Sequence, residues 1–367
     1  MSTKKRLLYI IVGTRPNFIK VTQFKKAAAK REGLEIRIVH TGQHFDDKMS
    51  KIFFTQFVLE PDKIINLTST TANSQIAEIM IRLEETFTAN RPDCIMVVGD
   101  VNSTLAGALV ANKMGIKLAH LESGLRSNDR SMPEEINRII TDQLADILFV
   151  TEESGIDNLV KEGKQAAQIH LVGNTMIDTM LAFDDEIAAS DILDIFKIVS
   201  HEFVLMTIHR PATVDNKEGL NKLFQLLKRL NKKRKIIFPI HPRTLKNIAK
   251  FGLEEELNSI ENLILTEPLD YFAFQKLIRD CCYILTDSGG IQEESTQRGV
   301  PCLTLRPNTE RPVTISCGTN TLIPFEIDMV LKYVDMIDSG NYKVGSIPPM
   351  WDGKATERVL DNLFTFI

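Results

Sequence analysis

The sequence predicts an α/β protein with two doubly wound parallel-sheet domains. Three observations support this fold class. Short β-branched runs alternate with longer amphipathic helical patterns, which is typical of parallel sheets wound by strand–helix units. The same alternation starts again after Gly173-Asn174-Thr175. Glycines and ionisable residues follow the predicted strands, and open α/β sheets bind their ligands at the carboxyl ends of strands.

The first series begins with a segment that superficially resembles a secretory signal. The basic residues up to Arg6 lead into a short apolar run, but Gly13-Thr14-Arg15-Pro16 stands where a cleavage site of small residues is expected, so we interpret the run as a strand. The predicted strands are Leu7 to Val12, Glu35 to His40, Cys94 to Val98, Lys117 to His120, Ile147 to Val150 and Ile169 to Val172. The predicted helices are Phe18 to Lys30, Ser74 to Ala89, Ser103 to Lys113, Glu134 to Ala145 and Ser154 to Glu162.

The second series follows a helical connector, roughly Met176 to Ala189. Its predicted strands are Phe203 to Ile208, Lys235 to Ile240, Leu263 to Thr266, Tyr283 to Thr286 and Cys302 to Leu305. We expect an N-terminal domain of residues 1–174, joined by the C-terminal helical pattern 355–367, and a C-terminal domain of residues 175–354. Two such domains facing each other would present the carboxyl ends of both sheets to one cleft.

Composition narrows the class of protein. The chain has 367 residues, enough for two ordinary domains, with 25% charged residues and a formal net charge of −4. This balance gives no basic excess for binding nucleic acid. No apolar run approaches the twenty residues of a membrane span. The five cysteines lack metal-ligand spacing and fit small core residues in a reducing cytoplasm.

A Gly-Gly turn between a predicted strand and a predicted helix is the leading candidate for a phosphate site. The stretch is Leu285-Thr286-Asp287-Ser288-Gly289-Gly290-Ile291-Gln292-Glu293-Glu294. Gly289 and Gly290 let backbone N–H groups approach a ligand, and the helix start adds the positive end of a dipole. Ser288 can donate from the same rim, and Glu294 can accept from hydroxyls such as those of a ribose. The alternative is an ordinary capped strand-to-helix turn.

Polar residues also follow the strands of the first half. Pro16 suits the first turn of a helix, so Arg15 and Lys20 flank a helix start that favours anions. The alternative for both cations is a solvated surface turn. The second strand ends in His40-Thr41-Gly42-Gln43-His44, which brings Gln43 and His44 to the same rim.

Three carboxylates are expected at this rim. Asp100 follows the third strand and could also serve only as a helix cap. Glu122 comes directly after a buried strand and before a glycine, with no capping partner nearby. Glu134 opens a helix behind Pro133. Carboxylates gathered beside Arg15, Lys20 and Arg126 would have pKa values spread apart, which acid–base chemistry uses.

In the second half, two histidines end neighbouring strands. His209 and His241 each stand beside an arginine and a proline, and we expect both histidines to contact the ligand. A lone histidine at a strand end is more often structural. Arg311, in Thr309-Glu310-Arg311-Pro312, is expected near the Gly289-Gly290 turn as a stabilising cation; the alternative is a charged surface loop.

Together these residues resemble the non-hydrolysing UDP-N-acetylglucosamine 2-epimerases, which have two Rossmann-like domains arranged as in GT-B glycosyltransferases. The resemblance covers almost the whole chain through the motifs GTRPNFIK, HTGQHFD, GDVNST, HLESGLRS, MPEEINR, GNTMID, HRP, HPR, LTDSGGIQEE and TERP. It implies interconversion of UDP-GlcNAc and UDP-ManNAc through elimination of UDP to 2-acetamidoglucal and re-addition. It implies no nicotinamide or metal, a homodimer, and a product destined for surface polysaccharides.

The resemblance also implies roles for single residues. Asp100, Glu122 and Glu134 match the acid–base set, and His209 matches a histidine on the phosphate side of the leaving UDP. The residues implied to hold the substrate are Arg15, Lys20, Phe274, Ser288, Gly289, Gly290, Glu294 and Arg311. Phe274 would pack beside the uracil and Glu294 would bind the ribose.

Two departures from the family pattern leave alternatives open. Allosterically activated bacterial members carry QHR followed by a second glutamine where this chain has Gln43-His44-Phe45-Asp46, and HRRE where it has His209-Arg210-Pro211-Ala212. Relatives with HTGQHFD-like segments include epimerases of UDP-2,3-diacetamido-glucuronic acid. A hydrolysing relative is disfavoured because it would resemble RxDYxK at Arg15. The remaining alternatives are a GT-B glycosyltransferase and a nucleotide-sugar sensor without turnover.

Overall fold

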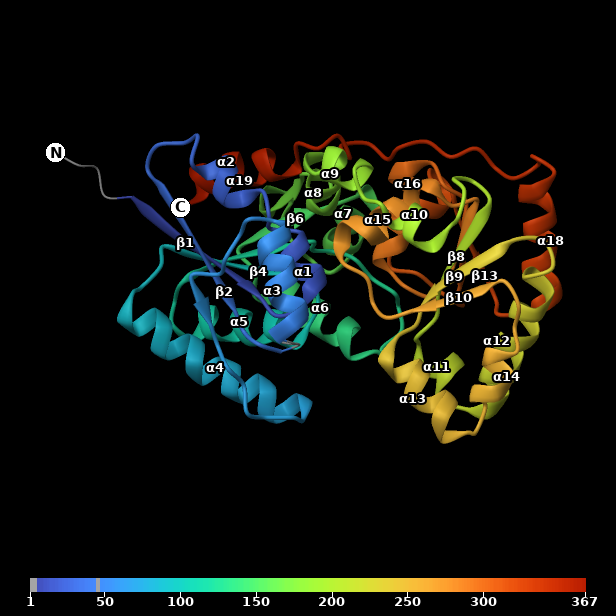
Figure 1. Cartoon of the computed structure of the whole chain (residues 1–367). Helices are drawn as coiled ribbons and strands as arrows, with labels where there is room; N and C mark the ends of the chain where they lie inside the picture. Colours follow the sequence, from blue (N-terminus) through green and yellow to red (C-terminus); the bar gives the residue numbers. More distant parts are fainter. Residues whose placement is uncertain (1–4, 44–46) are drawn as a thin grey trace. The chain divides into compact units, whose positions relative to one another are not determined.

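The structure is a computed structural model that describes residues 5–43 and 47–367 (Figure 1). The chain divides into two compact units. Unit 1 comprises Met1–Ala182 and Pro349–Ile367, and unit 2 comprises Phe183–Pro348. Each unit is built on one parallel sheet. The predicted α/β fold class is confirmed.

Within the described residues, the sheet of unit 1 has seven parallel strands in the order β3-β2-β1-β4-β5-β6-β7. The run that resembles a signal sequence is β1, paired on both sides by β2 and β4. The strands are β1 (Arg6–Val12), β2 (Leu34–His40), β3 (Lys63–Ile64), β4 (Cys94–Val98), β5 (Lys117–Leu121), β6 (Ile147–Val150) and β7 (Ile169–Leu171).

Helices cover both faces of this sheet because the strands are apolar on both faces. Alternate residues such as Ile95 and Val97 belong to one core cluster, while Met96 between them is also fully buried. The helices are α1 (Arg15–Ile19), α2 (Phe24–Ala28), α3 (Asp47–Gln56), α4 (Ala72–Ala89), α5 (Asn102–Lys113), α6 (Pro133–Leu144), α7 (Glu153–Lys161), the short 3-10 helix η1 (Ala166–Gln168), α8 (Thr175–Ala182) and α19 (Ala355–Phe366).

The sheet of unit 2 has six parallel strands in the order β10-β9-β8-β11-β12-β13. Its two faces form separate core clusters: Val204 and Met206 of β8 belong to one, and Phe203 and Leu205 to the other. The strands are β8 (Phe203–Thr207), β9 (Lys235–Pro239), β10 (Leu263–Thr266), β11 (Tyr283–Thr286), β12 (Cys302–Leu305) and β13 (Asn320–Ile323).

The helices of unit 2 lie between and beside these strands, and α12 and α18 pack against each other. They are α9 (Asp184–Ala188), α10 (Ile192–Phe196), α11 (Pro211–Val214), α12 (Lys217–Leu230), α13 (Pro242–Lys250), α14 (Glu254–Asn258), α15 (Tyr271–Asp280), α16 (Gly290–Arg298), α17 (Val313–Ser316) and α18 (Ile327–Asp338).

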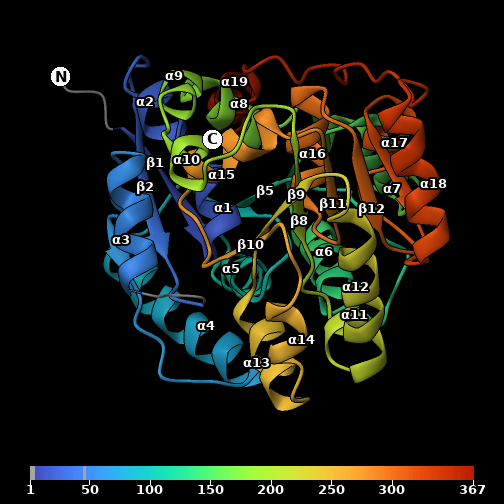
Figure 2. The ribbon, with the colours of Figure 1, turned by 45° about the vertical axis from the view of Figure 1, so that its right-hand side comes forward.

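The division between the units lies at the end of α8, whereas the expected boundary stands at its start. Helix α8 belongs to unit 1 because its buried side chains bond there: Thr179 donates to the carbonyl of Ile19 at 2.6 Å. Asp178 accepts the backbone N–H of Ala355 at 3.1 Å and of Thr356 at 2.6 Å, which caps α19. Figure 2 shows α19 beside α8.

Candidate active site

Asp100 and Glu122 leave neighbouring strands of unit 1. Strands β4 and β5 pair through Val98 and Leu121, the last residue of each. The N–H of Gly99 then donates to the carbonyl of Leu121 at 3.0 Å, which extends the pairing by one step. The two carboxylates therefore start from adjacent positions at the carboxyl end of the sheet, where ligands bind in open α/β folds.

Glu122 has a strained backbone and a buried carboxylate. Its φ is +71°, a left-handed conformation that a non-glycine residue adopts at a cost of about 1–3 kcal/mol. Its side chain is 6% exposed and forms an ion pair with Lys20, whose side chain is 7% exposed. Such strain persists where the surrounding structure holds it, and it is concentrated at functional sites.

Gly99 makes room for this ion pair. Its φ is +66°, and a Cβ added there would lie 3.2 Å from Oε2 of Glu122 and 3.0 Å from Nδ2 of Asn17. Asn17 in turn donates to the carbonyl of Val98 at 3.1 Å. Both the backbone conformation and the packing therefore favour glycine before Asp100, since a Cβ would have to displace Asn17 or Glu122 by a few tenths of an ångström.

Asp100 is half-buried and is held by Arg138, a residue that the sequence reasoning did not single out. The Arg138 guanidinium forms an ion pair with Asp100 and a second one with Glu135 at 2.6 Å. Burial opposes ionisation of Glu135, but hydrogen bonds from Ser127 and the charge of Arg138 outweigh it, so the pKa of Glu135 is lowered. The i,i+3 spacing of Glu135 and Arg138 on a helix was the available signal.

Glu134 lies in the first turn of α6 and is exposed, whereas its neighbour Glu135 is buried. The structure therefore gives the two adjacent carboxylates different environments. Glu135 accepts from the N–H groups of Ser127 and Asn128 at 3.0 and 2.9 Å and is committed to holding that loop. Glu134 remains accessible to a ligand.

Arg126 points into the protein and bonds to two carboxylates. It contacts Asp142 at 2.6 Å and Glu162 at 2.7 Å, and its side chain is 3% exposed. Burial disfavours the charged form, but the two carboxylates favour it more strongly and raise the pKa of Arg126. In this structure Arg126 supports the loop after Glu122.

The remaining predicted residues of unit 1 lie around the ends of β1 and β2. Arg15 begins α1 and its guanidinium lies 4.0 Å from the ring centre of Phe53, in cation–π geometry. The side-chain oxygen of Gln43 accepts from the N–H and the hydroxyl of Ser103 at 2.9 and 2.8 Å, at the start of α5. His44 lies outside the described residues.

In unit 2, Asp287 organises the turn after β8. Its buried carboxylate accepts the N–H groups of His209 and Arg210 at 2.9 and 2.8 Å. It also contacts Nδ1 of His209 at 2.9 Å. Because Nδ1 of His209 faces the carboxylate of Asp287, Nε2 is the ring nitrogen on the side away from Asp287.

His241 serves partly as a helix cap. Its Nδ1 accepts the N–H of Arg243 at 3.1 Å, at the start of α13. Its ring centre lies 5.3 Å from that of His209. The two predicted histidines are therefore neighbours.

The Gly-Gly turn leads into α16 as predicted, and Arg311 lies against it. A Cβ added at Gly289 would lie 2.8 Å from Oε1 of Glu310 and 2.9 Å from Nη1 of Arg311, so only glycine fits without a shift. Arg311 donates a hydrogen bond to Glu310 at 2.6 Å and forms an ion pair with Glu293 at 3.0 Å. The turn thus has a guanidinium at its side and a helix start below it, a setting that favours an anion.

A second arginine balances the carboxylate of Glu310. Arg306 contacts it at 2.9 Å, opposite Arg311. Burial opposes ionisation of Glu310, but the charges of Arg311 and Arg306 prevail and hold the pKa of Glu310 well below its usual range. Further along α16, Glu294 is 6% exposed. Phe274 on α15 is half-buried and packs against the adjacent apolar cluster.

Comparison with known proteins decides the family. The model of the UDP-N-acetylglucosamine 2-epimerase family matches residues 26–364. The chain belongs to this family. A UDP-N-acetylglucosamine 2-epimerase of Methanocaldococcus jannaschii is 39% identical over 361 residues, which cover 96% of this chain and 97% of that protein. The resemblance inferred from the motifs is thereby confirmed.

Solved structures agree with the family. A crystal structure of Methanocaldococcus jannaschii UDP-GlcNAc 2-epimerase in complex with UDP-GlcNAc and UDP has a TM-score of 0.88 and 38% identity, and the match covers 98% of this chain and 99% of that one. A lipopolysaccharide outer core galactosyltransferase shares the fold at a TM-score of 0.57 and 12% identity, over 99% and 100% of the two chains.

A third family relative differs in its substrate. The UDP-2,3-diacetamido-2,3-dideoxy-D-glucuronate 2-epimerase of Pseudomonas aeruginosa is 38% identical over 327 residues, which cover 88% of this chain and 89% of that protein. The Methanocaldococcus jannaschii and Pseudomonas aeruginosa relatives are thus almost equally identical to this chain, but they are named for different sugars. Overall identity does not discriminate between these sugars.

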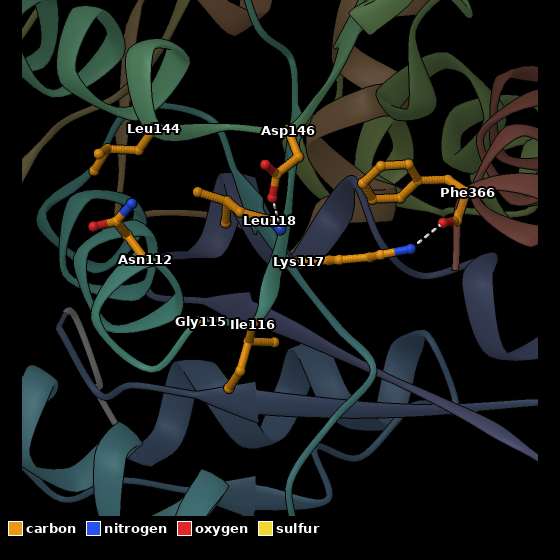
Figure 3. Close-up of a pocket in the computed structure, with 8 residues that line it drawn as sticks. All are labelled: Asn112, Gly115, Ile116, Lys117, Leu118, Leu144, Asp146 and Phe366. Atoms are coloured by element: carbon orange, nitrogen blue, oxygen red, sulfur yellow. Dashed lines mark hydrogen bonds between the residues drawn. The ribbon is translucent and has the colours of Figure 1, made fainter.

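A cavity of about 360 Å³ in unit 1 lies away from these residues (Figure 3). It is lined by Lys117 and Leu118, the first residues of β5, whereas Glu122 follows the last. Lys117 donates to the carbonyl of Phe366, whose ring closes one side. The cavity therefore marks where the end of α19 docks. Among the described residues, no helix is long and apolar enough to cross a membrane.

Proposed function

We propose that the protein interconverts UDP-GlcNAc and UDP-ManNAc by inverting C2 of the sugar. The observation that carries this proposal is the strained, buried carboxylate of Glu122, paired with Lys20, one strand away from Asp100. The C2 proton is weakly acidic, so its removal needs a positioned carboxylate base. Inversion needs a second proton donor on the opposite face, and this family member has three candidates.

The reaction consists of an elimination and its reversal with the other stereochemistry. A base takes the C2 proton, the C1–C2 double bond of 2-acetamidoglucal forms, and the C1–O bond breaks with its electron pair leaving on UDP. Re-addition of UDP at C1 accompanies delivery of a proton to the other face of C2. We assign Asp100, Glu122 and Glu134 to these proton transfers. Arg138 positions the carboxylate of Asp100 through an ion pair.

Departure of UDP requires groups that stabilise negative charge on the phosphates. In unit 2 we assign this role to Ser288, the Gly289-Gly290 turn and Arg311, with His209 as proton donor through Nε2. Asp287 supports the assignment because it holds Nδ1 of His209 at 2.9 Å. We also assign Arg15 and Lys20 of unit 1 to binding of the UDP-sugar.

We assign the nucleoside to two residues of unit 2. Glu294 would accept hydrogen bonds from the ribose hydroxyls because it carries a carboxylate. Phe274 would pack beside the uracil because it presents an aromatic ring, which lies against the apolar cluster described above. This arrangement uses neither a nicotinamide nor a metal.

Proton NMR of UDP-GlcNAc with the purified protein in deuterated water tests the proposal. The expected result is deuterium at C2 together with UDP-ManNAc. Free ManNAc would point to a hydrolase, and an unchanged spectrum with either UDP-sugar would overturn the proposal. Asp100→Asn and Glu122→Gln are expected to abolish exchange while UDP binding stays nearly intact. Loss of UDP binding in either variant would contradict the assignment to proton transfer.

UDP-2,3-diacetamido-glucuronic acid is the second candidate substrate, because the Pseudomonas aeruginosa relative named for it is 38% identical to this chain. The C2 chemistry is the same and the C3 and C6 groups differ. Parallel exchange experiments with both UDP-sugars at equal concentration separate the two. Faster exchange with the diacetamido uronate would assign the protein to that substrate.

The expected homodimer and cytoplasmic location also belong to this proposal. The five cysteines are free thiols, which fits a reducing compartment. Light scattering coupled to size-exclusion chromatography should give twice the 41.4 kDa chain mass. A mass of one chain at micromolar concentration would exclude the dimer.

A further inference from the structure

We propose that His120 and Asp142 form a buried brace that fixes the spacing between the turns carrying Asp100 and Glu122, and that His120 in this brace is protonated on both ring nitrogens. The inference rests on the proposed function because it assigns these two as positioning residues for its carboxylates. Neither side chain is expected to touch the substrate, since both are fully buried.

The hydrogen bonds of His120 define one end of the brace. Its Nε2 lies 2.8 Å from the carbonyl oxygen of Gly99, the residue before Asp100. Its Nδ1 lies 2.6 Å from Oδ1 of Asp142. A carbonyl oxygen only accepts and a carboxylate only accepts, so both ring nitrogens must donate. The ring is therefore an imidazolium held between two acceptors.

Asp142 carries the brace to the second turn. Its Oδ2 accepts the N–H of Gly124, two residues after Glu122, at 3.1 Å and the guanidinium of Arg126 at 2.6 Å. Burial opposes ionisation of Asp142, but the charges of His120 and Arg126 prevail and lower its pKa. Asp142 is thus a carboxylate, as the double donation by His120 requires.

The same brace reaches the third carboxylate through the backbone. Asp142 lies on α6, the helix whose first turn carries Glu134. One buried side-chain pair therefore connects the turn after β4, the turn after β5 and α6. The positive ring of His120 contacts the negative Asp142, which contacts the positive Arg126, which contacts the negative Glu162. The two positive and two negative charges in this chain of ion pairs therefore balance.

Turnover depends on this spacing because proton transfer requires the carboxylates at defined positions on the two faces of C2. A displacement of about 1 Å costs on the order of 100-fold in rate. Binding of UDP is assigned mainly to residues of unit 2, and the hydrogen bonds of the brace lie within unit 1, so UDP binding should be unaffected. The brace therefore predicts a loss in kcat without a matching change in KM.

Substitutions with and without the hydrogen bonds test the brace. Asp142→Asn keeps them, because its amide N–H can donate to Nδ1 of a neutral His120 while its oxygen accepts from Gly124 and Arg126. Asp142→Ala and His120→Phe remove them. We expect kcat to fall about 100-fold in Asp142→Ala and His120→Phe, with KM unchanged. Asp142→Asn should retain most of the wild-type kcat. His170→Phe, at another strand histidine of unit 1, should keep wild-type kcat.

Nitrogen-15 NMR of histidine-labelled wild-type protein gives a readout that does not depend on activity. His120 should show two protonated ring nitrogens at pH 7. The signal of His120 is identified because it should change to that of a neutral ring in Asp142→Asn. A single protonated nitrogen in the wild type would overturn the brace, as would unchanged kcat in Asp142→Ala. If the wild type shows the two protonated nitrogens yet exchanges no C2 proton from either UDP-sugar, the proposed function fails and the hydrogen-bonded geometry stands.

Discussion

At the residue scale, the site of unit 1 is an arrangement of buried charges that compensate one another. Glu122 pairs with Lys20, Asp100 with Arg138, and Glu135 with the same arginine. A buried ion pair adds little net stability when complete, but removing one partner leaves a costly unpaired charge. Each pair can therefore be probed by removing a single partner.

Lys20→Met should lower the free energy of unfolding by about 3 kcal/mol, because it removes the cation paired with the buried carboxylate of Glu122. Chemical denaturation followed by circular dichroism measures this. Adding Glu122→Gln to Lys20→Met should restore part of the loss, since the buried negative charge of Glu122 is then removed together with the positive charge of Lys20. Lys25→Met is the matched control: its pair with Asp62 is 30% and 36% exposed, so its loss should stay below about 1 kcal/mol. An equal loss in both lysine variants would contradict burial of the Lys20 pair.

A second residue-scale prediction concerns pH. Burial lowers the pKa of His40 from 6.5 to about 4. The unfolded histidine then takes up its proton at a higher pH than the folded one, so stability falls as pH drops from 6.5 toward 4, by roughly 3 kcal/mol in total. His40→Asn keeps an acceptor for the N–H of Gly42, which His40 Nδ1 accepts at 3.0 Å. Its stability measured by urea unfolding should vary less over this window; an unchanged pH slope would exclude His40 as the cause.

At the scale of elements, the connections between strands and helices carry the proposed catalytic residues. Helix α19, from the end of the chain, packs in the unit that holds three of these residues. This helix comes last in the chain but packs with α2 and α8 of unit 1. Its N-terminal N–H groups are satisfied by Asp178 from α8. The start of α19 is therefore held to unit 1 by a buried cap.

Asp178→Ala should lower the free energy of unfolding of unit 1 by about 2 kcal/mol, because two N–H groups at the buried start of α19 lose their acceptor. Thermal and urea unfolding measure the change. Asp361→Ala serves as the control within α19, since Asp361 is 68% exposed and its pair with Arg31 is worth less than about 1 kcal/mol. Equal stability of the two variants would show that the cap does not hold the helix.

At the scale of the whole molecule, the two units carry different halves of the proposed chemistry. Unit 1 supplies the carboxylates and unit 2 supplies the turn for the diphosphate. Turnover requires both, whereas binding of UDP should depend mainly on unit 2. Substitutions in the two units should therefore separate binding from reaction.

UDP at one hundred times its dissociation constant should stabilise the wild type by about 2.7 kcal/mol. Gly289→Ala should lose this increment, because the added Cβ would meet Glu310 and Arg311 at 2.8 and 2.9 Å. Glu122→Gln should keep it. Gly299→Ala, at the other end of α16 with open space around it, should also keep it. Thermal unfolding with and without UDP measures this stabilisation. If Gly289→Ala were still stabilised by UDP to the same extent, the Gly-Gly turn would not be part of the UDP site.

Much of the fold and several parts of the site could be predicted from the sequence. Alternating apolar runs and helical patterns are local signals, and they located the long strands of both units and most of the helices of unit 1. The predicted helix Phe18 to Lys30 was wrong, because the structure has two short helices there, α1 and α2. The two-residue strand β3, the edge strand β13 and the helix α3 were missed. The two short edge strands bury little apolar surface, so their sequence pattern is weak. Arg138 and Asp287 were also missed as site residues, because their roles depend on partners on other elements.

The sequence by itself determined the order of strands and helices, the family motifs and the residue types delivered to the strand ends, since each is written in contiguous stretches of chain. The tertiary structure alone decided which charges pair. Lys20 meets Glu122, Arg138 meets Asp100, and His120 meets both Asp142 and the carbonyl of Gly99. It also turned Arg126 from an expected ligand cation into a support for Asp142. The physical reason is that buried charges must be compensated locally, and their partners come from segments far apart in sequence that only the packed sheet and helices bring together.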